Sequence, residues 1–313
     1  MWRVVLISFL FWAFCGPVFG AERRYASIVV DADSLEIIHA RQIDELRFPA
    51  SLTKVMTLYL TFDALNAGQL HLKEPLPVSR TAALTPPSKL GLKTGQTITV
   101  ENLIQALTVK SANDAAVVLA ERLAGSEAAF ADLMTAKARS LGMMKTTFKT
   151  ANGLPHPEQR TSARDMAKLA SNILNNHRGY YHYFGLKDFH YAGQSYKNTN
   201  GLLHSLSGVD GFKTGYTRDS GYNLIISTQR EGRRLIAVVL GGASGKSRNE
   251  HMQDLVERSF TVMGVAPVKS SPTLTVIRED PPKIKTPQVA VSQAIKLRGR
   301  NNQTITIDSR NNP

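Results

Sequence analysis

The distribution of hydrophobic residues predicts strands near both ends of the chain. Apolar segments rich in β-branched residues flank polar turn residues at positions 31–34, which predicts a β-hairpin over residues 25–40. Two longer apolar segments, at 222–228 and 234–240, are separated by a polar turn that contains glycine, and they predict a second antiparallel pair. Strands from both ends are therefore expected in one sheet.

Between these regions the pattern predicts helices. Residues 51–66 are apolar on nearly every side, which is typical of a helix that is buried all round, and Pro49 suits its start. Residues 101–142 also have a helical pattern, with a break at Gly125 and Ser126. A stretch rich in proline, serine and threonine separates the two and is expected to be a loop up to about residue 98.

Two more helices are predicted further along the chain. One covers residues 162–175, with Thr161 or Ser162 as its cap and Asp165 in its first turn, and a last helix covers 249–263. The order of elements predicts an α+β fold: an antiparallel β-sheet flanked by helices, with a helical subdomain inserted between its strands. We assign residues 21–266 to this domain.

The two ends of the chain have a different character. Residues 1–20 contain a short basic start, an apolar segment and small residues before Ala21, which is typical of a cleaved secretory signal. The apolar segment is short for a membrane span, so a retained anchor is the less favoured alternative. The only cysteine is Cys15, so cleavage after Gly20 would leave no disulfide, thiol nucleophile or cysteine-based metal site. Residues 267–313 are rich in proline and basic residues and predict a flexible tail.

Composition narrows the class of partner. Hydrophobic residues make up 42% of the chain, as in ordinary globular proteins, and the formal net charge is +13. In an exported protein such a charge suits membrane head groups or acidic wall polymers, contacted through the basic tail, or serves solubility only. Nucleic acid is not expected, because no zinc spacing or RNA-binding signature is present. The eight histidines show no metal-ligand spacing, so neither a metal nor another cofactor is expected.

The first candidate for chemistry is Ser51 with Lys54. Residues three positions apart lie on one face of a helix, so the lysine amine can reach the serine hydroxyl. Burial disfavours the charged form of a lysine and lowers its pKa, which would let Lys54 act as a base towards a serine nucleophile. A helix cap with a snorkelling lysine would give the same short pattern.

Two further motifs follow in a fixed order. Ser111 and Asn113 form an S-x-N element at the junction of two helical patterns, and Lys213, Thr214 and Gly215 form a K-T-G element. Similar triplets at 93–95, 247–249 and 309–311 occur in the wrong order or in the tail. The ordered set matches the S-x-x-K, S-x-N and K-T-G elements of penicillin-binding proteins and serine β-lactamases.

The residues around these motifs carry a wider resemblance. The segments 49–57, 111–116, 161–167 and 209–217 are similar to those of the D-alanyl-D-alanine carboxypeptidases, the low-molecular-mass penicillin-binding proteins. The resemblance covers roughly residues 25–262. The family commonly has a C-terminal β-rich domain and an amphipathic membrane helix, and neither is apparent after residue 266.

The resemblance implies catalytic roles. Ser51 would attack the carbonyl of the penultimate D-alanine, Lys54 would take its proton, and Ser111 would relay that proton to the leaving group. Asn113 would hold the peptide backbone of the substrate. Backbone N–H groups of Ser51 and Tyr216 would form the oxyanion hole, which is typically worth about 2.7–4 kcal/mol per donor.

It also implies substrate-binding roles. Lys213 would keep the site positive, and Thr214, next to Gly215, would help to hold the terminal carboxylate. Thr217 and Arg248 are further candidates for that carboxylate, although Arg248 also fits a surface position before a helix. Because two nearby cations repel, Lys213 is expected to lower the pKa of Lys54.

The function implied is a serine D,D-carboxypeptidase that removes the terminal D-alanine from peptidoglycan stem peptides. It would act in the periplasm or on the outer face of the cell membrane and would be inhibited by β-lactams. A D,D-endopeptidase that cuts cross-links and a catalytically silent wall-binding scaffold remain alternatives. A β-lactamase is less favoured, because no E-x-x-L-N pattern follows the S-x-N element.

Overall fold

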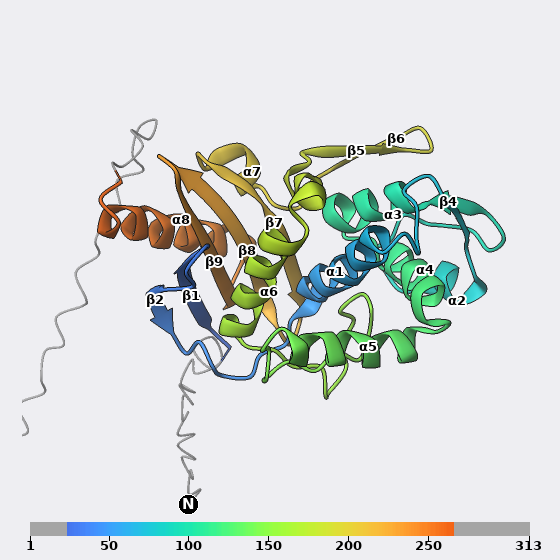
Figure 1. The fold of residues 1–313 in the computed structure, drawn as a ribbon, viewed down its shortest axis with the longest axis horizontal. Helices are drawn as coiled ribbons and strands as arrows, with labels where there is room; N and C mark the ends of the chain where they lie inside the picture. The colour runs from blue at the N-terminus through green and yellow to red at the C-terminus, as the bar shows by residue number, and fades with distance from the viewer. Residues whose placement is uncertain (1–23, 266–313) are drawn as a thin grey trace, which may run out of the picture. The chain divides into compact units, whose positions relative to one another are not determined.

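The computed structural model describes residues 24–265 (Figure 1). The predicted signal at 1–20 and the predicted tail at 267–313 lie outside these residues. None of the helices within residues 24–265 combines the length and the hydrophobicity that a membrane span requires. The strands are β1 (Ala26–Asp31), β2 (Ile37–Arg41), β3 (Pro75–Pro77), β4 (Thr97–Thr99), β5 (Asp188–Tyr191), β6 (Gln194–Lys197), β7 (Val209–Thr217), β8 (Gly221–Arg230) and β9 (Arg233–Gly242).

The helices form two groups. The α-helices are α1 (Thr53–Asn66), α2 (Arg80–Leu84), α3 (Val100–Gln105), α4 (Asn113–Ala124), α5 (Glu127–Ser140), α6 (Ala163–Asn176), α7 (Leu202–Ser205) and α8 (Gly245–Val262). One group makes up the helical region between β2 and α6, and the other, which includes α6 and α8, packs on the sheet. Shorter helical segments are η1 (Ala50–Leu52), the π-helical η2 (Ala106–Lys110) and η3 (Arg178–Gly185).

The main sheet joins the two ends of the domain, as predicted. Its order is β2-β1-β9-β8-β7, and all neighbours are antiparallel. Ala26 of β1 pairs with Leu240 of β9, so the N-terminal hairpin lies beside the C-terminal pair. The α+β prediction is therefore confirmed.

Alternate residues of the strands pack on opposite faces of this sheet. Ile28 and Val238 belong to the core shared with α1 and α6, whereas Val29 and Val239 belong to a second core under α8. Figure 1 shows α6 and α8 on opposite sides of the sheet. The sheet is thus covered on both faces.

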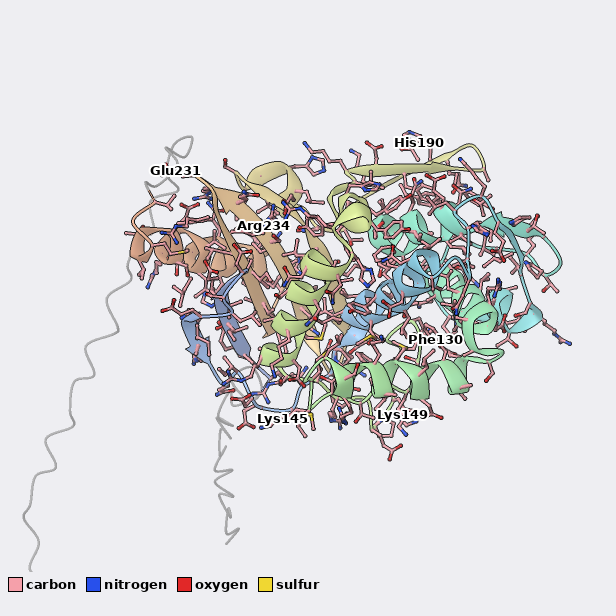
Figure 2. All side chains as sticks on the ribbon, viewed as in Figure 1. Phe130, Lys145, Lys149, His190, Glu231 and Arg234 are labelled. Carbon is pink, nitrogen blue, oxygen red and sulfur yellow. The ribbon has the colours of Figure 1, made fainter. Side chains whose placement is uncertain are left out.

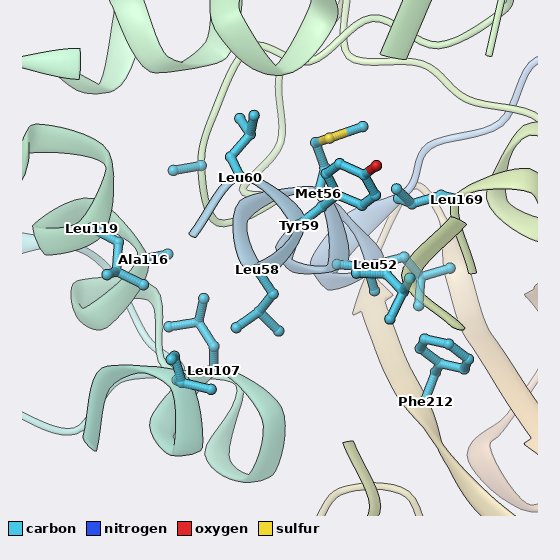
Figure 3. Packing of buried hydrophobic residues seen from close by; sticks show 14 of the residues in the cluster. Leu52, Met56, Leu58, Tyr59, Leu60, Leu107, Ala116, Leu119, Leu169 and Phe212 are labelled. Carbon is cyan, nitrogen blue, oxygen red and sulfur yellow. The ribbon is translucent and has the colours of Figure 1, made fainter. Parts of the chain in front are cut away.

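Helix α1 lies at the centre of the larger core. Figure 3 shows Leu52, Met56 and Leu58 among side chains from the sheet and from the helical region, including Phe212 and Leu107. All five side chains are buried. The nearly uniform burial of this helix, which the sequence predicted, fixes the position of its first turn against β7.

Several elements depart from the prediction. The stretch expected to be a loop contains β3, α2 and β4, and its segments of three to five residues are too short to show a periodic pattern. Strand β7 was not expected, because its glycines and polar residues interrupt any alternation. Helix α8 begins at Gly245, four residues before the predicted start, because Ser244 and Ser247 form a capping box.

Candidate active site

Ser51 and Lys54 meet at the junction of η1 and α1. The Nζ of Lys54 donates to Ser51 Oγ at 3.1 Å, to Asn113 Oδ1 at 2.7 Å and to the carbonyl of Asn152 at 2.6 Å. The Lys54 side chain is fully buried. The lysine is therefore held by three acceptors, one of which is the serine oxygen, so the alternative of a snorkelling lysine is excluded.

A second buried lysine approaches from the sheet. Lys213 is 1% exposed, and burial together with the nearby Arg248 cation lowers its pKa to about 7. Burial, followed by the charge of Lys213, holds the pKa of Lys54 well below that of an exposed lysine. The negative charges of Asp114 and Glu127 raise the pKa of Lys54, but they do not outweigh burial and Lys213. Burial and Lys213 thus favour the neutral amine on Lys54. A neutral amine keeps two N–H groups, which suffice for Asn113 and Asn152, and its lone pair can then accept the hydroxyl proton of Ser51 in the 3.1 Å contact.

The S-x-N element lies where η2 ends and α4 begins, as predicted. Ser111 is buried and has a left-handed backbone, with φ of 61°, which turns the chain sharply between the two helices. Asn113 accepts from Lys54 and donates through Nδ2 to the carbonyl of Pro86 at 2.9 Å. Its amide thus joins Lys54 to the segment between α2 and β4.

The K-T-G element lies on β7, beside the nucleophile turn. A Cβ atom on Gly215 would come within 3.1 Å of both Pro49 O and Ser51 N, so glycine lets the strand backbone approach η1 closely. Thr214 donates to Thr199 Oγ1 at 2.7 Å. Tyr216 is 55% exposed, and its ring lies 4.3 Å from that of Tyr222.

Thr217 lies at the end of β7, and Arg248 lies near the start of α8. The backbone N–H and the hydroxyl of Thr217 both bond to Ser220 Oγ, which closes the turn between β7 and β8. Arg248 is 7% exposed, and its Nη1 donates to the carbonyl of Asn223 at 2.7 Å. Burial lowers the pKa of Arg248 to about 10. The surface position considered for Arg248 is therefore wrong.

Two asparagines that sequence reasoning did not single out support the site. Asn152 supplies the carbonyl that holds Lys54, and Asn223 Nδ2 donates to the carbonyls of Phe48 and Pro49 at 3.0 and 3.1 Å. Both had a signal in the sequence. Asn152 precedes Gly153 in a turn dipeptide, and Asn223 is an amide inside an apolar strand segment.

Asn223→Ala is expected to lower the free energy of unfolding by about 1–3 kcal/mol and to slow acylation of Ser51. The side chain is fully buried and also accepts from Gly241 N at 2.9 Å, so alanine would leave buried backbone groups without partners and release the segment before Ser51. Urea unfolding and the rate of labelling by a fluorescent penicillin measure the two effects. Asn175→Ala, at an exposed position of α6, is the control, and equal behaviour of the two variants would contradict the prediction.

The chemistry that this arrangement supports is nucleophilic catalysis by a hydroxyl. A buried amine that favours its neutral form lies next to a serine at the start of a helix, whose N-terminal N–H groups favour developing negative charge. Within residues 24–265, no group of three or more histidine, cysteine or carboxylate side chains is placed to hold a metal ion.

Comparisons with known proteins agree with this chemistry. A family model described as D-alanyl-D-alanine carboxypeptidase matches residues 22–244. The D-alanyl-D-alanine carboxypeptidase DacC of Escherichia coli (strain K12) is 35% identical over 87% of this chain and 72% of its own length.

Solved structures show the same fold. Penicillin binding protein 5 from Haemophilus influenzae has a TM-score of 0.74 at 33% identity, over 79% of this chain and 72% of that one. Penicillin-Binding Protein D2 from Listeria monocytogenes, in an ampicillin-bound form, has a TM-score of 0.69 at 31% identity, over 75% and 96% of the two chains. This chain belongs to the D-alanyl-D-alanine carboxypeptidase family.

Proposed function

We propose that this protein is a serine-type D-Ala-D-Ala carboxypeptidase that removes the terminal D-alanine from peptidoglycan stem peptides. The observation that carries the assignment of residues is the 3.1 Å contact between Lys54 Nζ and Ser51 Oγ, with Lys213 opposing the charge of that lysine. Family membership supports the reaction class.

In the acylation step, neutral Lys54 takes the hydroxyl proton of Ser51 while Oγ bonds to the carbonyl carbon of the penultimate D-alanine. The carbonyl electron pair moves to the oxygen, which the N–H groups of Ser51 and Tyr216 stabilise. When the intermediate collapses, the C–N bond breaks, and Ser111 passes the proton to the nitrogen of the departing D-alanine. Water then hydrolyses the Ser51 ester.

Substrate binding falls to the residues around β7. Lys213, Thr214 and Arg248 supply positive charge and a hydroxyl for the terminal carboxylate, while Gly215 keeps the strand close to the nucleophile turn. Thr217 reaches the carboxylate only if it exchanges its bonds with Ser220, because both its N–H and its hydroxyl are engaged there. Asn113 orients the peptide backbone of the substrate from the opposite side.

We further propose that β-lactams acylate the same serine, as the ampicillin-bound form of the Listeria relative suggests. The protein would be exported and act in the periplasm or on the outer face of the cell membrane. Contact of the basic tail with membrane lipids or wall polymers remains a separate proposal. Deletion of residues 267–313 tests it by the loss of binding to isolated envelopes.

The experiment that tests the function has two parts. Intact-protein mass spectrometry after incubation with penicillin is expected to show one adduct per chain, and peptide mapping is expected to place it on Ser51. A synthetic pentapeptide ending in D-Ala-D-Ala is expected to release D-alanine. An adduct on another residue would overturn the assignment of Ser51, and the absence of any adduct or release would favour a silent scaffold. Cross-linked muropeptides cleaved faster than the pentapeptide would favour an endopeptidase.

A further inference from the structure

A half-buried carboxylate lies close to the Ser51–Lys54 pair. Glu127 is the first residue of α5, whose N-cap is Ser126. Its Oε1 accepts from the backbone N–H of Ala151 and from Asn152 Nδ2, both at 2.9 Å. Burial raises the pKa of this carboxyl group, and the mechanism above does not use it. One carboxylate oxygen therefore anchors two successive residues of the loop that holds Lys54.

That loop is the physical link between Glu127 and the reacting groups. The carbonyl of Asn152 accepts from Lys54 Nζ at 2.6 Å, and the carbonyl of Ala151 accepts from Thr57 Oγ1 at 2.6 Å. A Cβ on Gly153, which has φ of 87°, would lie 2.0 Å from the carbonyl oxygen of Ala50, directly before Ser51. The loop is thus packed against the nucleophile turn while Glu127 holds it from behind.

Charged groups face Lys54 from three elements. Lys213 on β7 disfavours the lysine cation, whereas Asp114 on α4 and Glu127 on α5 favour it. Asp114 is bound by the backbone N–H groups of Leu90, Gly91, Leu92 and Ala115. The charge of Glu121 on α4 disfavours the ionised form of Glu127 and raises its pKa. Glu127 is the carboxylate of this set that reaches Lys54 through a chain of hydrogen bonds.

We propose that Glu127 is a positioning residue for acyl transfer at Ser51. It holds the Asn152 carbonyl against Lys54, and its negative charge contributes, beside the larger effect of Asp114, to the pH range in which that lysine acts as a base. The inference rests on the function proposed above, because it assumes that Lys54 takes the proton of Ser51.

Glu127→Gln separates charge from geometry. The amide oxygen of glutamine still accepts from Ala151 and Asn152, but the negative charge is gone. The protonated form of Lys54 is then less favoured, so the acidic limb of the acylation rate against pH is expected to move to lower pH by on the order of one unit. A purely structural role would lower the rate at every pH and leave the limb in place.

The measurement is the second-order rate of acylation by a penicillin from pH 4.5 to 9, on the full chain. Glu158→Gln is the matched control, because Glu158 lies in the same loop region and its exposed carboxylate pairs with Lys149 at 3.2 Å. Figure 2 shows Lys149 at the surface beside α5. The control is expected to keep the wild-type profile. Thermal unfolding of each variant checks that the fold is intact.

The outcomes separate the inference from the proposed function. A Glu127→Gln profile that superimposes on the wild-type profile overturns the inference, as does a shift to higher pH. A shift to lower pH that the control does not show supports it. If wild-type protein is not acylated at any pH, the proposed function fails instead, and the two failures are distinct.

Discussion

Lys54→Met is expected to lower the rate at which penicillin acylates Ser51 by about 10²–10⁴-fold, the usual contribution of a positioned general base. Methionine has a similar length and fills the buried space, but it has no nitrogen to take the hydroxyl proton. The acceptors on Asn113 and Asn152 also lose their partner. Stopped-flow labelling with a fluorescent penicillin measures the rate.

Two further variants bracket this result. Ser51→Ala gives the background rate, because it removes the oxygen atom that bonds to the penicillin, and no adduct is expected. Lys246→Met gives the upper reference, since the Lys246 side chain is 85% exposed on α8. Acylation of Lys54→Met within a few-fold of the Lys246→Met rate would show that another group serves as the base.

Lys213→Met is expected to make the protein more stable at neutral pH while it weakens binding of the substrate carboxylate. Lys213 has a pKa of about 7 in the folded protein and the usual lysine pKa of 10.5 in the unfolded chain. This difference means that the buried cation lowers the stability of the folded state by about 5 kcal/mol at low pH. Replacement by methionine removes the charge and also one hydrogen bond, of 3.1 Å, from Lys213 Nζ to the carbonyl of Thr214. The gain therefore exceeds the loss of a typical hydrogen bond, about 1 kcal/mol.

The stabilisation has a definite pH dependence. Below pH 7 the folded and the unfolded wild-type chains both carry the proton on Lys213, so the full cost applies. Between about pH 7 and 10.5 the folded protein has released the proton while the unfolded chain keeps it, so the stability of the wild type rises with pH. Above both pKa values the cost is absent.

Urea unfolding of both proteins at pH 6.5 and pH 9.5 measures this effect, because titrating groups that do not interact with Lys213 cancel in the difference between them. Removal of Lys213 also relieves its repulsion of the Lys54 cation, which acts in the same direction. The advantage of Lys213→Met is expected to be several kcal/mol at pH 6.5 and less than about 1 kcal/mol at pH 9.5, after the lost hydrogen bond is subtracted. An advantage that grows with pH, or none at pH 6.5, contradicts a buried cation at this position. The release of D-alanine is expected to fall in the same variant.

Much of the frame of the site could be predicted from the sequence, because its elements carry local signals. The nearly uniform burial of α1, the cap of α6 at Ser162 and the apolar strands β8 and β9 each follow from residues within one short segment. The break at Ser111 follows from the change of pattern on either side. Three ordered motifs then place the candidate residues on these elements.

The remainder depends on contacts that no local pattern records. Strand β7 lacks alternation and is defined by its pairing with β8, where Gly215 lies opposite Asn223. Glu127 and Asn152 resemble a first-turn helix acid and a turn residue in the sequence, and their link to Lys54 appears only in three dimensions. The sequence alone does not decide between a surface position and a site position for Arg248. The carbonyl that Arg248 binds belongs to β8, which is distant in the sequence.

The sheet order β2-β1-β9-β8-β7 has a consequence for how the protein folds. Ser51 and Lys54 come early in the chain, but β7, the strand that faces them, joins the sheet through β8. Strand β8 pairs with β9, and β9 pairs with β1 near the start of the domain. Closing such a long loop is costly in entropy, so these pairings form slowly compared with helices. A folding intermediate that has its helices but lacks these strands has no complete site. Labelling by a penicillin during refolding would therefore count only the molecules that have completed the sheet.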